Sequence, residues 1–273
     1  MKYDCFKNKI AFITGSTSGF GKATAIELAK NGAIVILNYA NDDERAKKVV
    51  EEVSKYGTVG DCIKADISKE DDILKIVSII KEKFGKLDYL VNNAAIDIGG
   101  SFEEFAIDDF KKEINANLIH RFYLIQQSVE LMRKSDNPRI VNVASRYAER
   151  PLADASPLCI SEAGTVMLTK VAALELAKFN IRVNTVSPAL AITPLTEAIM
   201  NKEDFDAYAK VNPSGRVCDP QDVANTIVFL LSNDADYING ENVNVNGGIL
   251  LKWVILIWKK MYILILTIFI IID

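Results

Sequence analysis

Apolar and polar positions along the chain form a repeating order of short and long segments. Short runs that are apolar on both faces cover residues 10–14, 34–39, 62–64, 87–91, 139–143, 182–186 and 242–245. Segments with helical spacing lie between them at residues 22–30, 43–55, 69–84, 108–134, 157–179 and 220–231. Strands that are apolar on both faces belong to parallel sheets covered by helices on each side. The pattern predicts an α/β fold with a single doubly wound parallel sheet of about seven strands and helices on both faces.

The same alternation continues without a repeat or a low-complexity linker, so we predict one domain over residues 1–248 and a hydrophobic tail over residues 249–273. The tail carries Lys259 and Lys260 near its middle. At about +3 kcal/mol each, two central lysines would offset about ten to fifteen apolar residues at about −0.3 to −0.6 kcal/mol. Membrane contact through the tail is therefore possible but not favoured. An interfacial anchor, a subunit contact and an out-of-frame 3′ end are the other interpretations.

Composition excludes several classes of function. The net charge of −4 argues against a nucleic-acid partner, which requires a basic face. The four cysteines form no CxxC pair and the chain has one histidine, His120, so we predict no metal site. Residues 1–9 are polar and resemble no secretory signal, and we therefore expect a cytoplasmic protein with reduced thiols.

A glycine-rich segment, Thr14–Gly21, connects the first predicted strand to the first predicted helix. Glycines allow a tight turn there and let the backbone approach a pyrophosphate. The following helix offers unpaired N–H groups and the positive end of its dipole. The position at a strand-to-helix junction predicts a dinucleotide-binding turn.

The GxxxGxG spacing of this turn resembles that of the short-chain dehydrogenase/reductase family, and other motifs similar to the family's follow in order to residue 248. They are Ala65-Asp66-Ile67, Asn92-Asn93-Ala94-Ala95, Asn117-Leu118, the run ending in Ser145, the run ending in Pro188-Ala189, and Asn244-Val245-Asn246-Gly247-Gly248. The resemblance implies a Rossmann-type NAD(P)-dependent oxidoreductase. It implies cofactor contacts from Gly15, Ser16, Thr17, Ser18, Gly19, Phe20, Gly21, Tyr39, Asp66, Ile67, Asn93, Ala94, Ala95 and Pro188.

The expected cofactor is NADP, with NAD possible. An acidic residue at the end of the second strand would hold the 2′-hydroxyl of NAD, and this chain has Tyr39 there instead. Against this preference, Ser18 stands where NADP-dependent relatives often carry arginine.

The resemblance assigns catalytic roles to Ser145 and Asn117, but two other family positions differ. Counting thirteen residues from Ser145 reaches Leu158 where the family has its proton-donating tyrosine. Four residues further, Glu162 replaces the lysine that activates the tyrosine and holds the nicotinamide ribose. Leucine cannot donate a proton, and glutamate reverses the charge. Tyr147, beside Arg146, is an alternative donor.

The sequence therefore predicts an NAD(P)-binding oxidoreductase that is inactive or weakly active in carbonyl/alcohol hydride transfer. The alternatives are an active NADPH-dependent reductase of a small or acyl-carrier-bound carbonyl with another proton donor, and a non-catalytic nucleotide-binding or decayed protein. By the resemblance we also expect a homodimer or homotetramer. The substrate cannot be inferred from the sequence.

Overall fold

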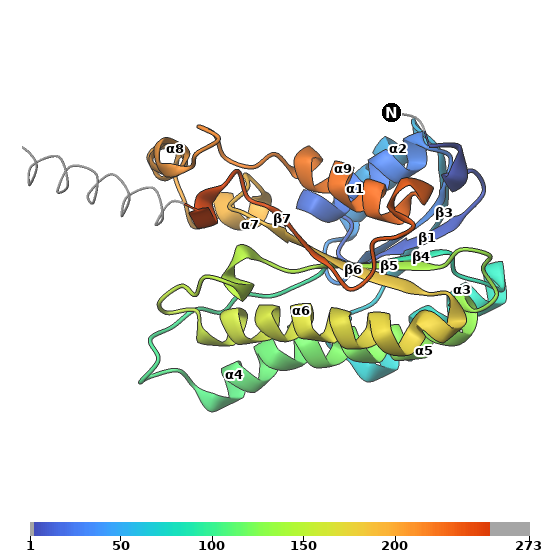
Figure 1. Cartoon of the computed structure of the whole chain (residues 1–273), viewed down its shortest axis with the longest axis horizontal. Helices are drawn as coiled ribbons and strands as arrows, with labels where there is room; N and C mark the ends of the chain where they lie inside the picture. The colour runs from blue at the N-terminus through green and yellow to red at the C-terminus, as the bar shows by residue number, and fades with distance from the viewer. Residues whose placement is uncertain (1–2, 252–273) are drawn as a thin grey trace, which may run out of the picture.

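The strands form one parallel sheet in the computed structural model, which describes residues 3–251 (Figure 1). The order across the sheet is β3-β2-β1-β4-β5-β6-β7. The strands span Ile10–Ile13, Ile34–Tyr39, Thr58–Lys64, Tyr89–Asn92, Arg139–Val143, Arg182–Pro188 and Asn242–Val245 for β1 to β7. The order reverses between β1 and β4, and ligands of such sheets bind beyond the carboxyl ends of the strands at this point.

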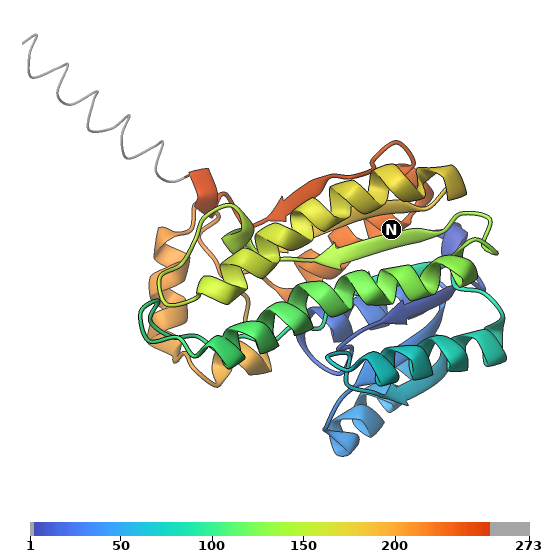
Figure 2. The ribbon, with the colours of Figure 1, turned by 90° about the horizontal axis from the view of Figure 1, so that it is seen from below.

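Helices cover both faces of the sheet. One face carries α1 (Gly19–Lys30), α2 (Asp43–Ser54) and α9 (Pro220–Leu231). The other carries α3 (Glu70–Phe84), α4 (Ile107–Ile114), α5 (His120–Met132) and α6 (Ser156–Leu176). Of these, α3, α5 and α6 lie side by side in front of the sheet in Figure 2, which views the molecule from below. The predicted fold class is confirmed.

Alternate residues of each strand enter two separate cores. In β1, Ala11 and Ile13 pack in the cluster with α1 and α9, whereas Ile10 and Phe12 pack in the cluster with α3 and α5. All four are at most 5% exposed. Successive side chains of a strand point to opposite faces, so a central strand must be apolar at every position.

The predicted helix over residues 108–134 is interrupted by a π-helical turn, η2 (Asn115–Ile119), between α4 and α5. The Asn117 side chain is fully buried and its amide pairs with both backbone groups of Ile96, at 2.9 Å to N and 2.8 Å to O. Such bulges are frequent at functional sites. Helical periodicity could not reveal this turn because the chain remains helical on both sides of it.

Two helices lie in a region whose sequence has no recognisable helical pattern. These are α7 (Pro194–Glu197) and α8 (Lys202–Val211). Thr193 and Asn201 are their N-cap residues, and each forms a capping box with the residue three positions later. The helices are short and largely exposed, so they lack the apolar periodicity by which longer helices are predicted.

The described chain continues past Gly248 into a single turn, Ile249–Leu251, in which Ile249 is buried. The remainder of the predicted tail lies outside the described residues. Among residues 3–251, one helical segment, Ser156–Phe179, is long and apolar enough to cross a membrane. It packs on β6 and carries buried polar residues such as Glu162 and Thr165, as a core helix does.

Candidate active site

The predicted phosphate turn occupies the switch point, between β1 and α1. Gly15 and Gly19 have positive φ of 60° and 51°, in the left-handed region that favours glycine. Gly21 has no room for a side chain, because a Cβ atom there would lie 2.5 Å from the Gly15 carbonyl oxygen. The spacing of these three glycines therefore follows from the backbone path of the turn.

The turn is joined to the loop after β4. The Thr14 hydroxyl oxygen accepts hydrogen bonds from the backbone N–H groups of Asn93 and Ala94, at 2.9 and 3.0 Å. The Asn93 amide donates to the carbonyl oxygens of Thr14 and Gly15, at 3.0 and 3.1 Å. These bonds bring two predicted cofactor segments, far apart in sequence, into direct contact.

A cavity of about 360 Å³ lies on one side of the turn, and most of its lining is backbone or apolar. Asp66 caps the adjoining turn, since its Oδ1 accepts from the N–H and the hydroxyl of Ser68. The cavity suits the flat adenine ring and its ribose. Its lining residues are Gly15, Asn38, Ala40, Asn41, Ala65, Asp66, Ile67, Ser68, Ala94, Ala95, Ile96, Lys112 and Ala116.

Two residues that were predicted to contact the cofactor, Tyr39 and Ser16, do not line this cavity. The Tyr39 hydroxyl donates to Asp43 Oδ1 at 2.8 Å, a bond that raises the pKa of Tyr39 to about 12. Tyr39 lines a separate hollow with Cys62, while its neighbours Asn38 and Ala40 line the adenine-side cavity. Ser16 is fully buried, and its hydroxyl accepts from the backbone N–H of Asn38.

A larger cleft of about 520 Å³ continues from the turn toward β5 and α6. It has two ionisable lining side chains among the described residues, Arg45 and Glu162, one on α2 and the other on α6. Its full lining is Gly15, Ser18, Gly19, Phe20, Arg45, Asn93, Ala94, Ala95, Val143, Ala144, Glu162, Thr193, Pro194, Leu195 and Ala198. The cleft and the adenine-side cavity share Gly15 and the loop after β4, so together they match an extended dinucleotide.

The predicted residues Thr17 and Pro188 are buried and do not line these two cavities. Ser145 lies two residues after the end of β5, and its Oγ accepts from the backbone N–H of Tyr147 at 3.3 Å. Asn117 lies on η2 with both ends of its amide bonded to Ile96, which fixes the loop after β4.

The two positions at which the sequence analysis predicts a departure from the family pattern lie one turn apart on α6. Leu158 and Glu162 are 9% and 2% exposed. Arg121, on α5, reaches toward Glu162 with Nη1 3.9 Å from Oε2, and its side chain is equally buried. Sequence reasoning missed Arg121, although its i+4 spacing from Asn117 indicates that the two share a helix face.

Burial is the main reason that the pKa of Glu162 is raised to about 7. The positive charge of Arg121 lowers this pKa, and the negative charge of Glu113 raises it. Burial also lowers the pKa of Arg121. This part of α6 thus carries an apolar side chain, Leu158, and a buried carboxyl coupled to the Arg121 guanidinium.

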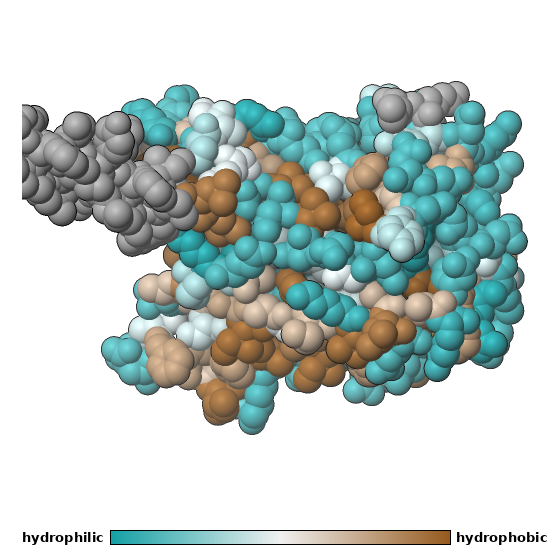
Figure 3. Space-filling model, in the orientation of Figure 1, coloured by the Kyte–Doolittle hydropathy of each residue, from teal (hydrophilic) through white to brown (hydrophobic). Residues whose placement is uncertain are grey.

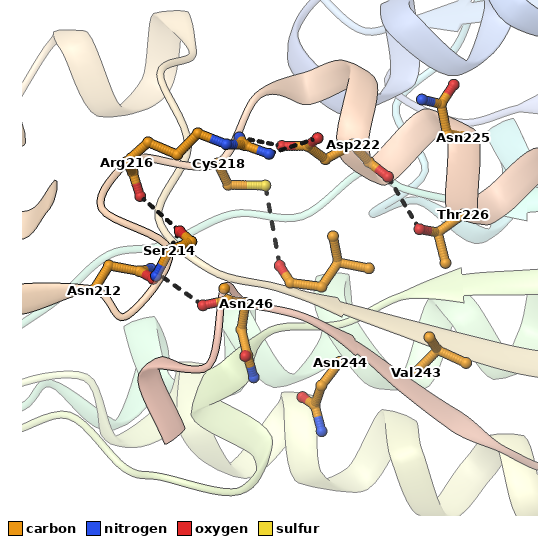
Figure 4. Close-up of a pocket in the computed structure, with 12 residues that line it drawn as sticks. Asn212, Ser214, Arg216, Cys218, Asp222, Asn225, Thr226, Val243, Asn244 and Asn246 are labelled. Atoms are coloured by element: carbon orange, nitrogen blue, oxygen red, sulfur yellow. Dashed lines mark hydrogen bonds and ion pairs between the residues drawn. The ribbon is translucent and has the colours of Figure 1, made fainter. Parts of the chain in front are cut away.

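A further cavity, of about 410 Å³, lies between the loop before α9 and β7. Figure 4 shows the residues that line it. Its charged groups bond to each other: Arg216 donates to both carboxylate oxygens of Asp222, at 2.5 and 2.9 Å. Burial raises the pKa of the Cys218 thiol to about 11, so this thiol is not activated. None of the residues predicted to contact the cofactor lines this cavity.

Across residues 3–251, no cluster of three or more His, Cys, Asp or Glu side chains could hold a metal ion. The phosphate turn, the switch point and the elongated cleft define a Rossmann-type nucleotide-binding domain. The chain belongs to the short-chain dehydrogenase/reductase family: a family model described as enoyl-(acyl carrier protein) reductase matches residues 15–250. By family it is an oxidoreductase with an NAD(P)-binding fold, as the sequence motifs predicted.

Its relatives include 3-oxoacyl-[acyl-carrier-protein] reductases. The chain is 33% identical over 242 residues to the 3-oxoacyl-[acyl-carrier-protein] reductase FabG of Staphylococcus epidermidis, covering 88% of this chain and 98% of the relative. It is 35% identical over 242 residues to subunit BbsD of a (2S)-[(R)-hydroxy(phenyl)methyl]succinyl-CoA dehydrogenase of Thauera aromatica, covering 89% and 96%. An actinorhodin polyketide ketoreductase solved with NADPH is similar in structure, with a TM-score of 0.84, 30% identity, and 91% and 99% coverage.

Proposed function

We propose that this protein binds NADP(H) in the cleft beside the phosphate turn and transfers hydride between the cofactor and a carbonyl or alcohol only slowly. One observation carries the slow-transfer proposal: α6 presents Leu158 and the buried Glu162 at the two positions where the family resemblance places a tyrosine and a lysine. Reduction of a carbonyl creates an alkoxide that needs a proton donor of matched pKa. No tyrosine or lysine is among the residues lining this cleft.

Ser145 and Asn117 remain in the positions that the family resemblance assigns to catalysis. The serine hydroxyl stands at the carboxyl end of β5, where its proton could polarise a substrate carbonyl. Incubation of the protein with NADPH and a 3-oxoacyl thioester tests the proposal. We expect NADPH to bind, and its oxidation to exceed the background rate by less than 100-fold; brisk oxidation would contradict slow transfer.

A reductase with a different donor is the second candidate function, and it has one supporting observation. The Arg146 Nη2 atom donates to the Tyr147 hydroxyl at 3.0 Å, and Tyr147 is bonded through its N–H to Ser145 Oγ. A phenol held by a guanidinium beside Ser145 could supply a proton. If the unaltered protein turns over briskly, Tyr147→Phe should abolish the activity in this case and leave NADPH binding unchanged.

The preference for NADP over NAD is supported by Arg45. This residue lines the cleft together with Ser18, the position where NADP-dependent relatives often carry arginine. Its guanidinium lies 3.1 Å from Asp42 and is half exposed, so it is available to a phosphate. Arg45 is therefore the cation that we assign to the 2′-phosphate of NADP. The sequence pattern does not single out Arg45, because this residue lies within a run of charged residues that is typical of a solvated helix start.

Replacing Arg45 with alanine should weaken NADPH binding about tenfold and leave NADH binding unchanged, since only NADPH carries the 2′-phosphate. Fluorescence titration with each cofactor measures both affinities. Lys47→Ala is the matched control, because Lys47 lies on the same helix, pairs with Glu44 at 2.8 Å and does not line the cleft. Equal losses for both cofactors would contradict the assignment of Arg45 to the 2′-phosphate.

We further propose self-association through the outer faces of α5 and α6. Figure 3 shows apolar side chains gathered over the lower helices of the molecule. The exposed apolar residues on these helices and on η2 are Ile119, Phe122, Ile160, Met167, Val171 and Leu174, and Leu174 is 80% exposed. Exposed patches of this kind mark interfaces.

Leu174→Glu should shift the oligomer toward the monomer, because pairing would bury the added carboxylate without a partner. Sedimentation velocity at micromolar protein measures the distribution. Tyr237→Glu is the control, since Tyr237 is also fully exposed but lies outside this face. A monomeric unaltered protein would contradict the proposal.

A further inference from the structure

A buried cluster of charged side chains lies behind the cleft, on the helical face formed by α4, α5 and α6. It consists of Glu113, Arg121 and Glu162, one from each helix. All three residues are at most 2% exposed, and Glu162 is the one that also lines the cleft. Charged residues are rarely this buried unless they are paired.

The hydrogen bonding within the cluster is incomplete. Arg121 Nη1 donates to the Thr165 hydroxyl at 2.7 Å, but Arg121 Nη2 has no hydrogen-bond partner among the described residues. The same holds for Glu162 Oε2, which is 3.9 Å from Arg121 Nη1, beyond hydrogen-bond distance. Buried polar atoms are nearly always bonded, and an unbonded one costs about 1–3 kcal/mol, or more when charged. Glu162 Oε2 is thus a buried acceptor without a bond, on a residue that also lines the cleft.

The charges around Glu162 come from a small set of groups. Arg121 on α5 attracts it, and Glu113 on α4 repels it. On η3 (Arg146–Ala148), which also packs on α6, Arg146 bonds to Tyr147. Glu149, directly after η3, accepts from Asn242 and Asn244. On β6, Arg182 pairs with Asp236. Arg121 is therefore the cation that compensates the charge of Glu162.

Resting on the proposed binding of NADP(H) in this cleft, we propose that Glu162 and Arg121 together replace the lysine that the family carries at position 162. The Glu162 carboxylate accepts hydrogen bonds from the hydroxyls of the nicotinamide-side ribose. Arg121 is a positioning residue that favours the ionised form of this carboxyl and orients it. The pair would thus bind the ribose, as the lysine does, but would not activate a proton donor.

This arrangement makes cofactor affinity depend on pH near neutrality. Burial holds the pKa of free Glu162 at about 7, so half of the molecules have a protonated carboxyl there. Ribose hydroxyls donate to the ionised form, and cofactor binding must therefore lower this pKa and release a proton. Affinity should rise as pH increases through 7.

The test is titration of the full-length protein with NADPH between pH 6 and pH 8, beside the Glu162→Gln variant. We expect the affinity of the unaltered protein to rise about fivefold to tenfold over this range relative to the variant, since one pKa unit corresponds to a factor of ten. The variant also measures how much of the pH dependence of NADPH affinity arises from the 2′-phosphate, whose own pKa is about 6. Equal slopes for the two proteins overturn the inference.

Arg121→Leu should move the midpoint of the pH profile upward by about one unit or more, because the removed cation lowers the pKa of Glu162. Arg121→Lys, which keeps the charge, should restore most of the original midpoint. A purely structural role of Arg121 would change thermal stability in both variants without moving the midpoint, and that result overturns the positioning role.

If Glu162→Gln does not fold, the unaltered protein labelled with δ-¹³C-glutamate provides the same test. A buried carboxyl that titrates near pH 7, with a midpoint that falls on addition of NADPH, supports the inference, and a midpoint unmoved by NADPH overturns it. Failure of the proposed function is distinguishable, because then neither protein binds NADPH at any pH.

Discussion

Reduction of a 3-oxoacyl thioester by NADPH should accelerate about 10²–10⁴-fold when Leu158→Tyr, Glu162→Lys and Arg121→Leu are combined. Positioned acid–base catalysis contributes about this much, equivalent to about 3–5 kcal/mol of barrier. Ser145, Asn117 and the phosphate turn are already in the unaltered protein. The first two substitutions supply a phenol and an ammonium group one turn apart on α6.

The third substitution is required because of a contact that the sequence did not show. A lysine introduced by Glu162→Lys would lie against the buried Arg121 guanidinium, now 3.9 Å from the Glu162 carboxylate. Two like charges about 4 Å apart repel by about 4 kcal/mol at an effective dielectric constant of 20, which equals the expected catalytic gain. We therefore expect the paired change Leu158→Tyr with Glu162→Lys, without the change at Arg121, to give little activity and a less stable protein.

Initial rates of NADPH oxidation for the unaltered, double and triple variants measure this prediction, with thermal unfolding recorded for each. Leu158→Tyr alone is the control for the phenol without its cation, and it should remain near the original rate. A folded triple variant that binds NADPH without faster reduction would show that more than these three side chains separates the chain from an active reductase.

Cofactor binding should be lost in Gly19→Leu, with affinity reduced at least about 100-fold, or about 2.7 kcal/mol. Gly19 has φ of 51°, and its Cβ atom would lie 3.3 Å from Thr193 Cγ2, across the cleft. A leucine side chain would therefore occupy the space beside the turn that we assign to the pyrophosphate. Titration with NADPH and NADH up to millimolar concentration measures the loss.

Gly85→Leu is the matched control for the backbone effect. Gly85 ends α3 with φ of 71°, and a Cβ atom there would meet no heavy atom within 4 Å. In both variants a residue with a side chain must adopt a positive φ, which costs about 1–2 kcal/mol of folding free energy. Both should therefore unfold at a somewhat lower temperature. Retention of NADPH binding by Gly19→Leu at the level of Gly85→Leu would disprove the location of the nucleotide site.

Thermal stability should also fall as pH rises from about 5 to 8. The pKa of Glu162 is raised by burial above its unfolded value, so its protonated form stabilises the folded state and this contribution is lost as pH rises through about 7. Differential scanning calorimetry across this range should show a weaker decline in Glu162→Gln than in the unaltered protein. An equal decline would place the pH dependence on other groups, such as Glu113.

Much of the fold could be predicted from local sequence because its elements are long, regular and strongly patterned. β5, α9 and β7 were predicted at the bounds that the structure shows. β3 was predicted too short, as residues 62–64 instead of Thr58–Lys64, because this edge strand is only partly buried and less apolar. The glycine turn could also be predicted, since its conformational requirement is local and only glycine satisfies it cheaply.

The relation between residues distant in sequence was decided by the tertiary structure alone. Sequence spacing placed Leu158 and Glu162 on one face of a helix, but not Arg121 of another helix beside Glu162. Sequence position predicted Tyr39 beside the nucleotide. In the folded chain the Tyr39 hydroxyl bonds to Asp43, and Arg45 lines the cleft. The sequence thus determines the fold, the glycine turn and the shared helix face of Leu158 and Glu162, because these depend on local backbone preference and periodicity. The electrostatic environment of those residues depends on which side chains the packing of separate helices brings together, and only the folded chain specifies that.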